Sequence, residues 1–258
     1  MSSVGKVEEY LLSKIRNDGA IHLTLIDPEQ ECITTASQKV IEAEKGGTAA
    51  IMIGGSTAVA ASHLDEIVRT IKKKVNVPII LFPSNVAGIS RFADAIWFMS
   101  LLNSTNPYFI TGVQALGAPL VKMYGLEPLP MGYVIVGEGG AAGYVGQAHL
   151  IPYNMPKIVA AYALAAQYLG MHFVYLEAGS GANQHVPLEV VKTVREVISL
   201  PLIVGGGIKN ENAAKQIVKA GANIIVTGTL VEETPFIQQR ISAIVSGIKS
   251  LPKPTFLF

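Results

Sequence analysis

Eight short runs rich in β-branched and other apolar residues recur along the chain, with segments of helical periodicity between them. This alternation is typical of parallel strands joined by crossover helices. Most of the runs are apolar on both faces, as expected of strands that helices cover. The runs occupy residues 21–27, 48–55, 78–83, 93–99, 132–138, 172–178, 201–206 and 223–228.

The strand count predicts the fold class. Eight such strands match a closed (β/α)8 barrel of the TIM type, and 258 residues is an ordinary length for one. An open, doubly wound sheet is the alternative, because sequence alone does not show closure. No Pro- or Ser-rich linker interrupts the chain, so we expect residues 1–258 to form a single catalytic barrel domain. The segment 100–111, SLLNSTNPYFIT, predicts a long loop and a modified barrel after the fourth strand.

Charge and cysteine content exclude several classes of protein. The formal net charge is +1 and there is no long basic run, so no nucleic-acid partner is expected. Cys32 is the only cysteine, which excludes an intrachain disulfide framework and a thiolate metal cluster. The first residues do not resemble a signal peptide, and the apolar stretch 158–178 contains Gln167, His172 and Glu177. We therefore expect a cytoplasmic protein without a transmembrane anchor.

Two carboxylates stand at the ends of predicted strands. Barrels of this type carry their catalytic groups at the carboxyl ends of the strands and in the loops that follow. The first run ends in Asp27 and the sixth contains Glu177 near its end. Strand alternation lets both side chains point into the barrel mouth. An Asp before a proline is equally suited to capping a helix or pairing with a basic residue, so both interpretations of Asp27 stay open.

The last two runs end in glycine-rich segments, at 205–207 and at Gly228. Glycine lets backbone N–H groups approach an anion closely, and the loops after strands seven and eight are the usual phosphate site of such barrels. The sequence therefore predicts a phosphate site there. A magnesium ion would need only one carboxylate and one hydroxyl besides substrate oxygens, which Asp27 and Ser56 provide. The five histidines have no metal-ligand spacing and are expected to be surface or satisfied polar groups.

Several segments, in order, resemble the geranylgeranylglyceryl phosphate synthases of archaea and, more distantly, the bacterial heptaprenylglyceryl phosphate synthases. The resemblance spans almost the whole chain. It implies transfer of a geranylgeranyl group from geranylgeranyl diphosphate to the C3 hydroxyl of sn-glycerol 1-phosphate, the first ether bond of archaeal membrane lipids, with Mg²⁺ bound to the diphosphate. The segments are HLTLIDPE, IMIGGST, LLNSTNPYFITG, AAYALAAQYLG, VYLEAGSGA, VGGGI and VTGTL.

The resemblance also implies roles for individual residues. Asp27 and Ser56 match the magnesium-site pair, and Glu177 matches the group that accepts the hydroxyl proton. One branch of the family has a lysine where this chain has Leu25. Lys209 is a candidate for the missing cation, with a solvated surface lysine as the alternative interpretation. Members of the other branch are often oligomers, so a homo-oligomer is implied. The residues that match the glycerol-phosphate site are Tyr175, Leu176, Glu177, Ala178, Gly179, Ser180, Gly181, Gly206, Gly207, Gly228 and Thr229.

A C20 chain would require an apolar groove, because leaving it in water costs about 0.8 kcal/mol per CH₂. The lipid product implies no more than transient contact with a membrane surface. Two other functions stay open: an isomerase or lyase acting on a phosphorylated substrate, and a non-catalytic barrel that binds a phosphorylated ligand. The aromatic residues that suit either the groove or the plain core are Trp97, Phe98, Tyr108, Phe109, Tyr124 and Tyr133.

Overall fold

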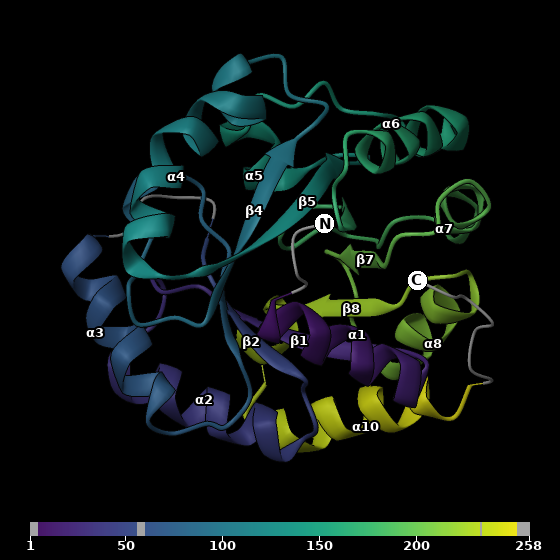
Figure 1. Ribbon diagram of the computed structural model, residues 1–258. Helices are drawn as coiled ribbons and strands as arrows, with labels where there is room; N and C mark the ends of the chain where they lie inside the picture. The colour runs from purple at the N-terminus through teal and green to yellow at the C-terminus, as the bar shows by residue number, and fades with distance from the viewer. Residues whose placement is uncertain (1–4, 56–59, 233, 252–258) are drawn as a thin grey trace.

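Eight parallel strands close into a barrel in sequence order (Figure 1). The structure is a computed structural model that describes residues 5–55, 60–232 and 234–251. Closure comes from the pairing of the first strand with the last, so the predicted (β/α)8 barrel is confirmed and the open sheet is excluded. The strands are β1 (Ile21–Ile26), β2 (Ala50–Ile53), β3 (Ile79–Leu81), β4 (Ala95–Leu101), β5 (Glu127–Ile135), β6 (Phe173–Glu177), β7 (Leu202–Gly205) and β8 (Ile224–Thr227).

Helices surround the barrel on the outside in Figure 1. Their apolar faces pack on the outward-facing strand residues, while a second apolar cluster fills the barrel interior. Among the described helices, none combines the length and the apolar character needed to cross a membrane. The helices are α1 (Lys6–Asp18), α2 (Ile33–Lys45), α3 (Ala61–Lys72), α4 (Val113–Tyr124), α5 (Gly140–Val145), α6 (Pro156–Tyr168), α7 (Leu188–Arg195), α8 (Glu211–Lys219), α9 (Thr229–Glu232) and α10 (Ile237–Lys249).

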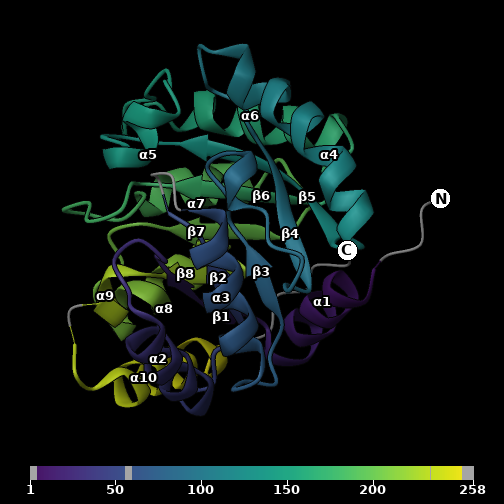
Figure 2. The same ribbon diagram turned by 90° about the vertical axis from the view of Figure 1, so that its left-hand side faces the viewer.

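Helix α1 covers the amino-terminal end of the barrel. Leu11 and Ile15 belong to the cluster that fills the barrel interior. The carboxylate of Glu127 accepts hydrogen bonds from the backbone N–H groups of Val7 and Glu8, both at 2.8 Å. These N–H groups lie in the first turn of α1, where no carbonyl of the helix itself can accept from them. Figure 2 shows α1 at one end of the molecule and α5 and α9 at the other. The open end of the barrel is therefore the end where the strands finish.

Strand β5 begins at Glu127, ahead of the predicted start at residue 132. Pro128 and Pro130 argue against a strand there, because proline cannot donate to a sheet. Pairing with β6, however, begins only at Met131, and residues 127–130 pair with β4 alone. The prolines thus lie where β5 has a strand on one side only, which is where a sheet tolerates them.

The barrel wall is incomplete between β3 and β4. A single 3-10 turn, Val86–Gly88, stands where the regular pattern has a crossover helix. The short β3 pairs with β4 only as far as Leu81 opposite Ile96, whereas β4 continues to Leu101. On the side that faces β3, the part of β4 after Ile96 therefore has no described strand beside it.

The loop after β4 is shorter than the sequence predicted. Ser100 and Leu101 still belong to β4, and a π-helical turn, Tyr108–Gly112, leads directly into α4. The side chain of Asn106 accepts a hydrogen bond from the N–H of Tyr108 at 2.9 Å and so caps this turn, with proline at the next position favouring a helical start. The modified geometry expected after the fourth strand is thus a π-helical entry rather than a long overhanging loop.

Candidate active site

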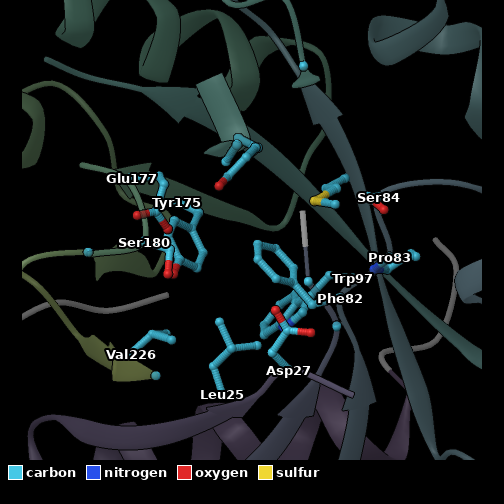
Figure 3. A pocket seen from close by; sticks show the side chains of 18 of the residues that line it. Leu25, Asp27, Phe82, Pro83, Ser84, Trp97, Tyr175, Glu177, Ser180 and Val226 are labelled. Atoms are coloured by element: carbon cyan, nitrogen blue, oxygen red, sulfur yellow. The ribbon is translucent and has the colours of Figure 1, made fainter. Parts of the chain in front are cut away.

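A pocket of about 540 Å³ opens at the carboxyl ends of the strands. Both predicted carboxylates, Asp27 and Glu177, line it. In Figure 3, Glu177, Tyr175 and Ser180 lie on one side of the pocket and Asp27 on the other, with Phe82 between them. The two carboxylates therefore share one mouth, as strand alternation predicted.

Glu177 is buried at the end of β6, with 6 % of its surface exposed. Its Oε1 accepts a hydrogen bond from the N–H of Gly179 at 2.6 Å. Burial raises the pKa of the Glu177 carboxyl, while hydrogen bonds from Gly179, Tyr175 and Tyr133 work against that rise. A buried carboxyl group with a raised pKa, facing a pocket, is suited to accept a proton from a bound alcohol.

Three aromatic rings support Glu177 from inside the barrel. Phe82 stacks on Tyr175 at 5.6 Å between ring centroids, and Tyr133 meets Tyr175 edge-on at 5.2 Å. Burial and the nearby charge of Glu177 raise the pKa values of Tyr133 and Tyr175 well above the ordinary value. Both hydroxyl groups therefore stay protonated and act as donors toward the carboxylate.

Glycines at the end of β7 and directly after it make room for this arrangement. A Cβ atom on Gly205 would lie 2.0 Å from the hydroxyl oxygen of Tyr175. Gly207 has φ +66°, and a Cβ there would meet the backbone of Gln184 at 2.4 Å. These positions cannot accept a side chain without moving the groups around the pocket.

Most of the predicted acceptor-site residues lie together. Leu176 and Ala178 do not: both pack in the outer apolar layer between sheet and helices, because alternate residues of β6 face opposite ways. The N–H of Gly179 is engaged by Glu177. The residues that line the pocket are Tyr175, Glu177, Ser180, Gly181, Gly206, Gly207, Gly228 and Thr229.

Asp27 faces the pocket from the end of β1. Its Oδ1 accepts a hydrogen bond from the N–H of Glu29 at 3.0 Å, so the local turn expected of an Asp before proline also forms. A Cβ on Gly55 would lie 2.6 Å from this oxygen, which leaves the carboxylate an open approach. Ser56, the second predicted ligand, lies outside the described residues.

The described residues contain no group of three or more His, Cys, Asp or Glu side chains that could enclose a metal ion. A single carboxylate beside a glycine fits instead an ion that keeps water and substrate phosphates in its shell, as Mg²⁺ does. The donor set at Asp27 is therefore compatible with magnesium bound together with a diphosphate.

The pocket continues as an apolar groove through the incomplete wall between β3 and β4. Ile89 lines it on one side, and Val113, Gly117 and Val121 line it from α4. These three α4 residues are spaced four apart and so lie on one face of the helix. This spacing is visible in the sequence, but none of the three is aromatic, so they were not among the predicted groove residues. Of the six aromatic candidates, Trp97, Phe98, Phe109 and Tyr133 line the pocket and Tyr108 and Tyr124 do not.

Gln114 joins α4 to the extended edge of β4. Its Nε2 donates to the backbone oxygen of Met99 at 2.6 Å and to that of Phe109 at 3.1 Å. Its Oε1, like Nε1 of Trp97, is buried without a hydrogen-bond partner among the described residues. Both residues line the groove, so its wall contains isolated polar atoms in an otherwise apolar setting.

Lys209 and Arg240 are the cationic side chains among the described residues that line the pocket. No ion pair involves either of them within the described part of the chain. Lys209, the candidate for the missing cation, thus lines the pocket, and Arg240, on α10, was not anticipated. Both side chains add positive charge to a pocket that also contains the carboxylates of Asp27 and Glu177.

Comparison with known proteins reveals close relatives. The sequence profile of the PcrB family matches residues 13–248. A geranylgeranylglyceryl phosphate synthase of Thermofilum pendens is 55 % identical over 95 % of this chain and 96 % of its own length. One of Thermococcus sibiricus is 49 % identical over 97 % of this chain and 99 % of its own length. The crystal structure of (S)-3-O-geranylgeranylglyceryl phosphate synthase from Thermoplasma acidophilum, in complex with its substrate sn-glycerol-1-phosphate, superposes with a TM-score of 0.92. It is 42 % identical, and the match covers 95 % of this chain and 99 % of that one.

Proposed function

The chain belongs to the PcrB family, and on that premise we propose that it is a prenyltransferase that joins geranylgeranyl diphosphate to sn-glycerol 1-phosphate. The observation that carries this proposal is the position of Glu177. This buried carboxylate lies in one pocket with the glycine loops after β7 and β8 and with an apolar groove. A small phosphorylated alcohol and a long hydrocarbon would meet in such a pocket.

The acceptor would bind with its phosphate on the loops at Gly206–Gly207 and Gly228–Thr229. Positive φ at Gly206 and Gly207 turns the backbone there in a way that suits anion binding. Lys209 and Arg240 would add positive charge on this side of the pocket. The glycerol part would then extend toward Ser180 and Glu177.

Glu177 would accept the proton of the C3 hydroxyl as that oxygen attacks C1 of the prenyl group. The new C–O ether bond forms while the bond between C1 and the diphosphate oxygen breaks, and the electron pair of that bond leaves with the diphosphate. Tyr133 and Tyr175 hold the carboxylate in place. The aromatic rings beside it keep water from the reacting carbon.

The C20 chain would lie in the groove between the 3-10 turn and α4. At about 0.8 kcal/mol per CH₂, burial of even half of the chain contributes substantially to donor binding. Asp27, with Ser56 as the second ligand, would hold Mg²⁺, which neutralises charge on the departing diphosphate. The donor therefore enters with its diphosphate at β1 and its tail across β4.

We further propose that residues 1–258 act as one catalytic domain in the cytoplasm and that the chain forms a homo-oligomer. Exposed apolar residues on α4, Leu116 and Met123, support an oligomer contact on an outer helix. Tyr144 on α5, beside the pocket-lining Val145, supports transient contact of the pocket rim with a membrane surface. Light scattering and flotation with lipid vesicles test these two contacts.

A transfer assay with radiolabelled geranylgeranyl diphosphate and sn-glycerol 1-phosphate tests the reaction. We expect label to move into an acid-stable ether that retains phosphate, and we expect the transfer to stop when EDTA removes magnesium. Release of labelled geranylgeraniol without ether, or no consumption of the donor by folded protein, would contradict the proposal.

A further inference from the structure

A closed set of polar side chains lies where the barrel closes between β8 and β1, on the outward-facing side of these strands, opposite to Leu23 and Val226 of the interior cluster. Its members are His22 and Thr24 on β1, Thr48 before β2, and Thr227 at the end of β8, and none is more than 3 % exposed. His22 Nδ1 lies 3.1 Å from Oγ1 of Thr48, and His22 Nε2 lies 2.9 Å from Oγ1 of Thr227. Four polar side chains buried together carry a cost that only complete mutual hydrogen bonding offsets.

The donors in this set can be assigned. Thr24 donates to Oγ1 of Thr48 at 3.1 Å, and the hydroxyl of Thr48 donates to the backbone oxygen of His22 at 3.1 Å. A second carbonyl, that of Ala50, lies 3.3 Å from the same hydroxyl. With the single proton of Thr48 directed to one of these two carbonyls, we assign the ring of His22 as the donor to Thr48, through Nδ1–H. Nε2 is then an acceptor, and it receives the hydroxyl proton of Thr227.

The set connects the two strands that carry opposite halves of the pocket. Thr227 lines the pocket and is followed directly by Gly228 and Thr229. Thr24 pairs with Thr227 in the strand register, and β1 ends one residue before Asp27. The hydroxyl of Thr227 is thus fixed from the outer side of the sheet, at the point where the chain turns into the proposed phosphate loop.

We propose that His22 is a positioning residue for acceptor binding: its Nε2 holds Thr227, and through Thr227 it fixes the phosphate loop Gly228–Thr229. His22 itself would touch no substrate. Its role rests on the proposed function, because the loop it holds is the one assigned to the acceptor phosphate. Burial lowers the pKa of His22 to about 3, in keeping with a ring that stays neutral and accepts this hydrogen bond at every working pH.

Two substitutions at His22 separate its contacts. His22→Gln can place an oxygen near the position of Nε2 and keep the bond to Thr227, whereas His22→Asn reaches only as far as Nδ1 and keeps the bond to Thr48. We expect His22→Asn to raise KM for sn-glycerol 1-phosphate about five- to tenfold, the size of one lost hydrogen bond. His22→Gln should stay near the wild-type value, and KM for geranylgeranyl diphosphate should not change in either variant.

Thr227 provides an independent test without a change of shape. Thr227→Val should raise KM for the acceptor as His22→Asn does, and Thr227→Ser, which keeps the hydroxyl, should not. The double variant His22→Asn/Thr227→Val should be no worse than either single variant, because both remove the same bond. Equal losses of Tm in all variants with unchanged acceptor KM would overturn the proposal and leave these residues a purely structural role.

Calorimetric binding of sn-glycerol 1-phosphate in the absence of donor makes the outcome independent of turnover. Weaker binding by Thr227→Val than by Thr227→Ser supports the proposal even if no ether is formed. Nitrogen-15 NMR of the His22 ring should show protonated Nδ1 and unprotonated Nε2 from pH 5 to pH 8, and a protonated Nε2 would overturn it. If the wild type binds no acceptor while the NMR assignment holds, the proposed function has failed rather than the hydrogen-bonded set.

Discussion

A Cβ atom on Gly206 would lie 2.3 Å from Oε1 of Glu177 and 2.8 Å from the N–H nitrogen of Gly179. The glycine after β7 and the carboxylate at the end of β6 therefore share one space, and the hydrogen bond that holds the carboxylate depends on the absence of a side chain. Gly206 also has φ +81°, a conformation that other residues rarely adopt.

Replacement of Gly206 by alanine should displace Glu177. We expect kcat/KM for ether formation to fall about 100-fold, the order of loss that a displacement of about 1 Å of a reacting group causes. Gly170→Ala is the matched control, because Gly170 has φ +80° but a Cβ there would meet nothing within 4 Å. Both variants should lose stability, and only Gly206→Ala should lose activity. Equal activity of the two variants would contradict the close contact.

The activity should depend on ionisation of Glu177. Burial raises its pKa, so the proton-accepting carboxylate appears only as pH rises through that raised value. The rate should therefore increase over a higher pH range than for an ordinary carboxyl group. At pH values above the raised pKa, Glu177→Gln should lower kcat by about 10² to 10⁴, the range for general acid–base groups, and the rate of the variant should no longer rise with this ionisation. Near-wild-type kcat in the Glu177→Gln variant would remove Glu177 from the mechanism.

The same pKa shift predicts a change in stability. Because the pKa of Glu177 is raised in the folded state, its stabilising contribution is complete below its unfolded pKa and is lost as pH rises through the folded value. The Gln side chain of the Glu177→Gln variant stays neutral, so this variant should not lose stability in this way as pH rises. In thermal unfolding, the Tm of this variant minus that of the wild type should therefore increase between pH 4 and pH 8. A difference that stays constant over this range would contradict the cost of burying the ionised carboxylate of Glu177.

Gly117 tests the path of the prenyl chain. A Cβ at Gly117 would lie 3.1 Å from Cδ1 of Ile89 across the groove, so Gly117→Leu should close it. We expect KM for geranylgeranyl diphosphate to rise about tenfold, which corresponds to about 1.4 kcal/mol, with acceptor KM unchanged. Ala118→Leu, on the exposed side of the same helix, is the control and should behave as wild type.

Asp27 tests the magnesium site. Asp27→Asn should lower kcat/KM about 100-fold or more, since a Lewis acid at the leaving group contributes several kcal/mol. Added Mg²⁺ should restore part of the activity at high concentration. Asp18→Asn removes a carboxylate that pairs with Lys249 on α10, away from the pocket, and should leave the magnesium dependence unchanged. An Asp27→Asn variant with wild-type magnesium dependence would exclude this site.

The strand pattern predicted the barrel because each strand is locally apolar and β-branched. The incomplete wall had a signal too: only nine residues, 84–92, separate the third and fourth predicted strands, fewer than a crossover helix needs. The early start of β5 could not be predicted, because Pro128 is tolerated there only through the register of β4 and β6.

Within the site, strand ends predicted that Asp27 and Glu177 face the pocket, and glycines predicted the loops after β7 and β8 that line it. Gln114 and Arg240 were not predicted, because each reaches the pocket from a helix through contacts between segments distant in sequence. The His22 set was foreseen only as a satisfied polar group. Its link to Thr227 joins the first and last strands, and that neighbourhood exists only after the barrel closes.

In the proposed reaction, a phosphate on the loops after β7 and β8 places the C3 hydroxyl of the acceptor against Glu177. The most direct test is a comparison of kcat/KM for sn-glycerol 1-phosphate and its sn-3 enantiomer, with geranylgeranyl diphosphate and Mg²⁺ present. We expect ether formation with the first and little or none with the second, because the enantiomer would direct its free primary hydroxyl away from the carboxylate. Equal rates with the two enantiomers, or ether formation that persists in Glu177→Gln, would contradict the proposed reaction.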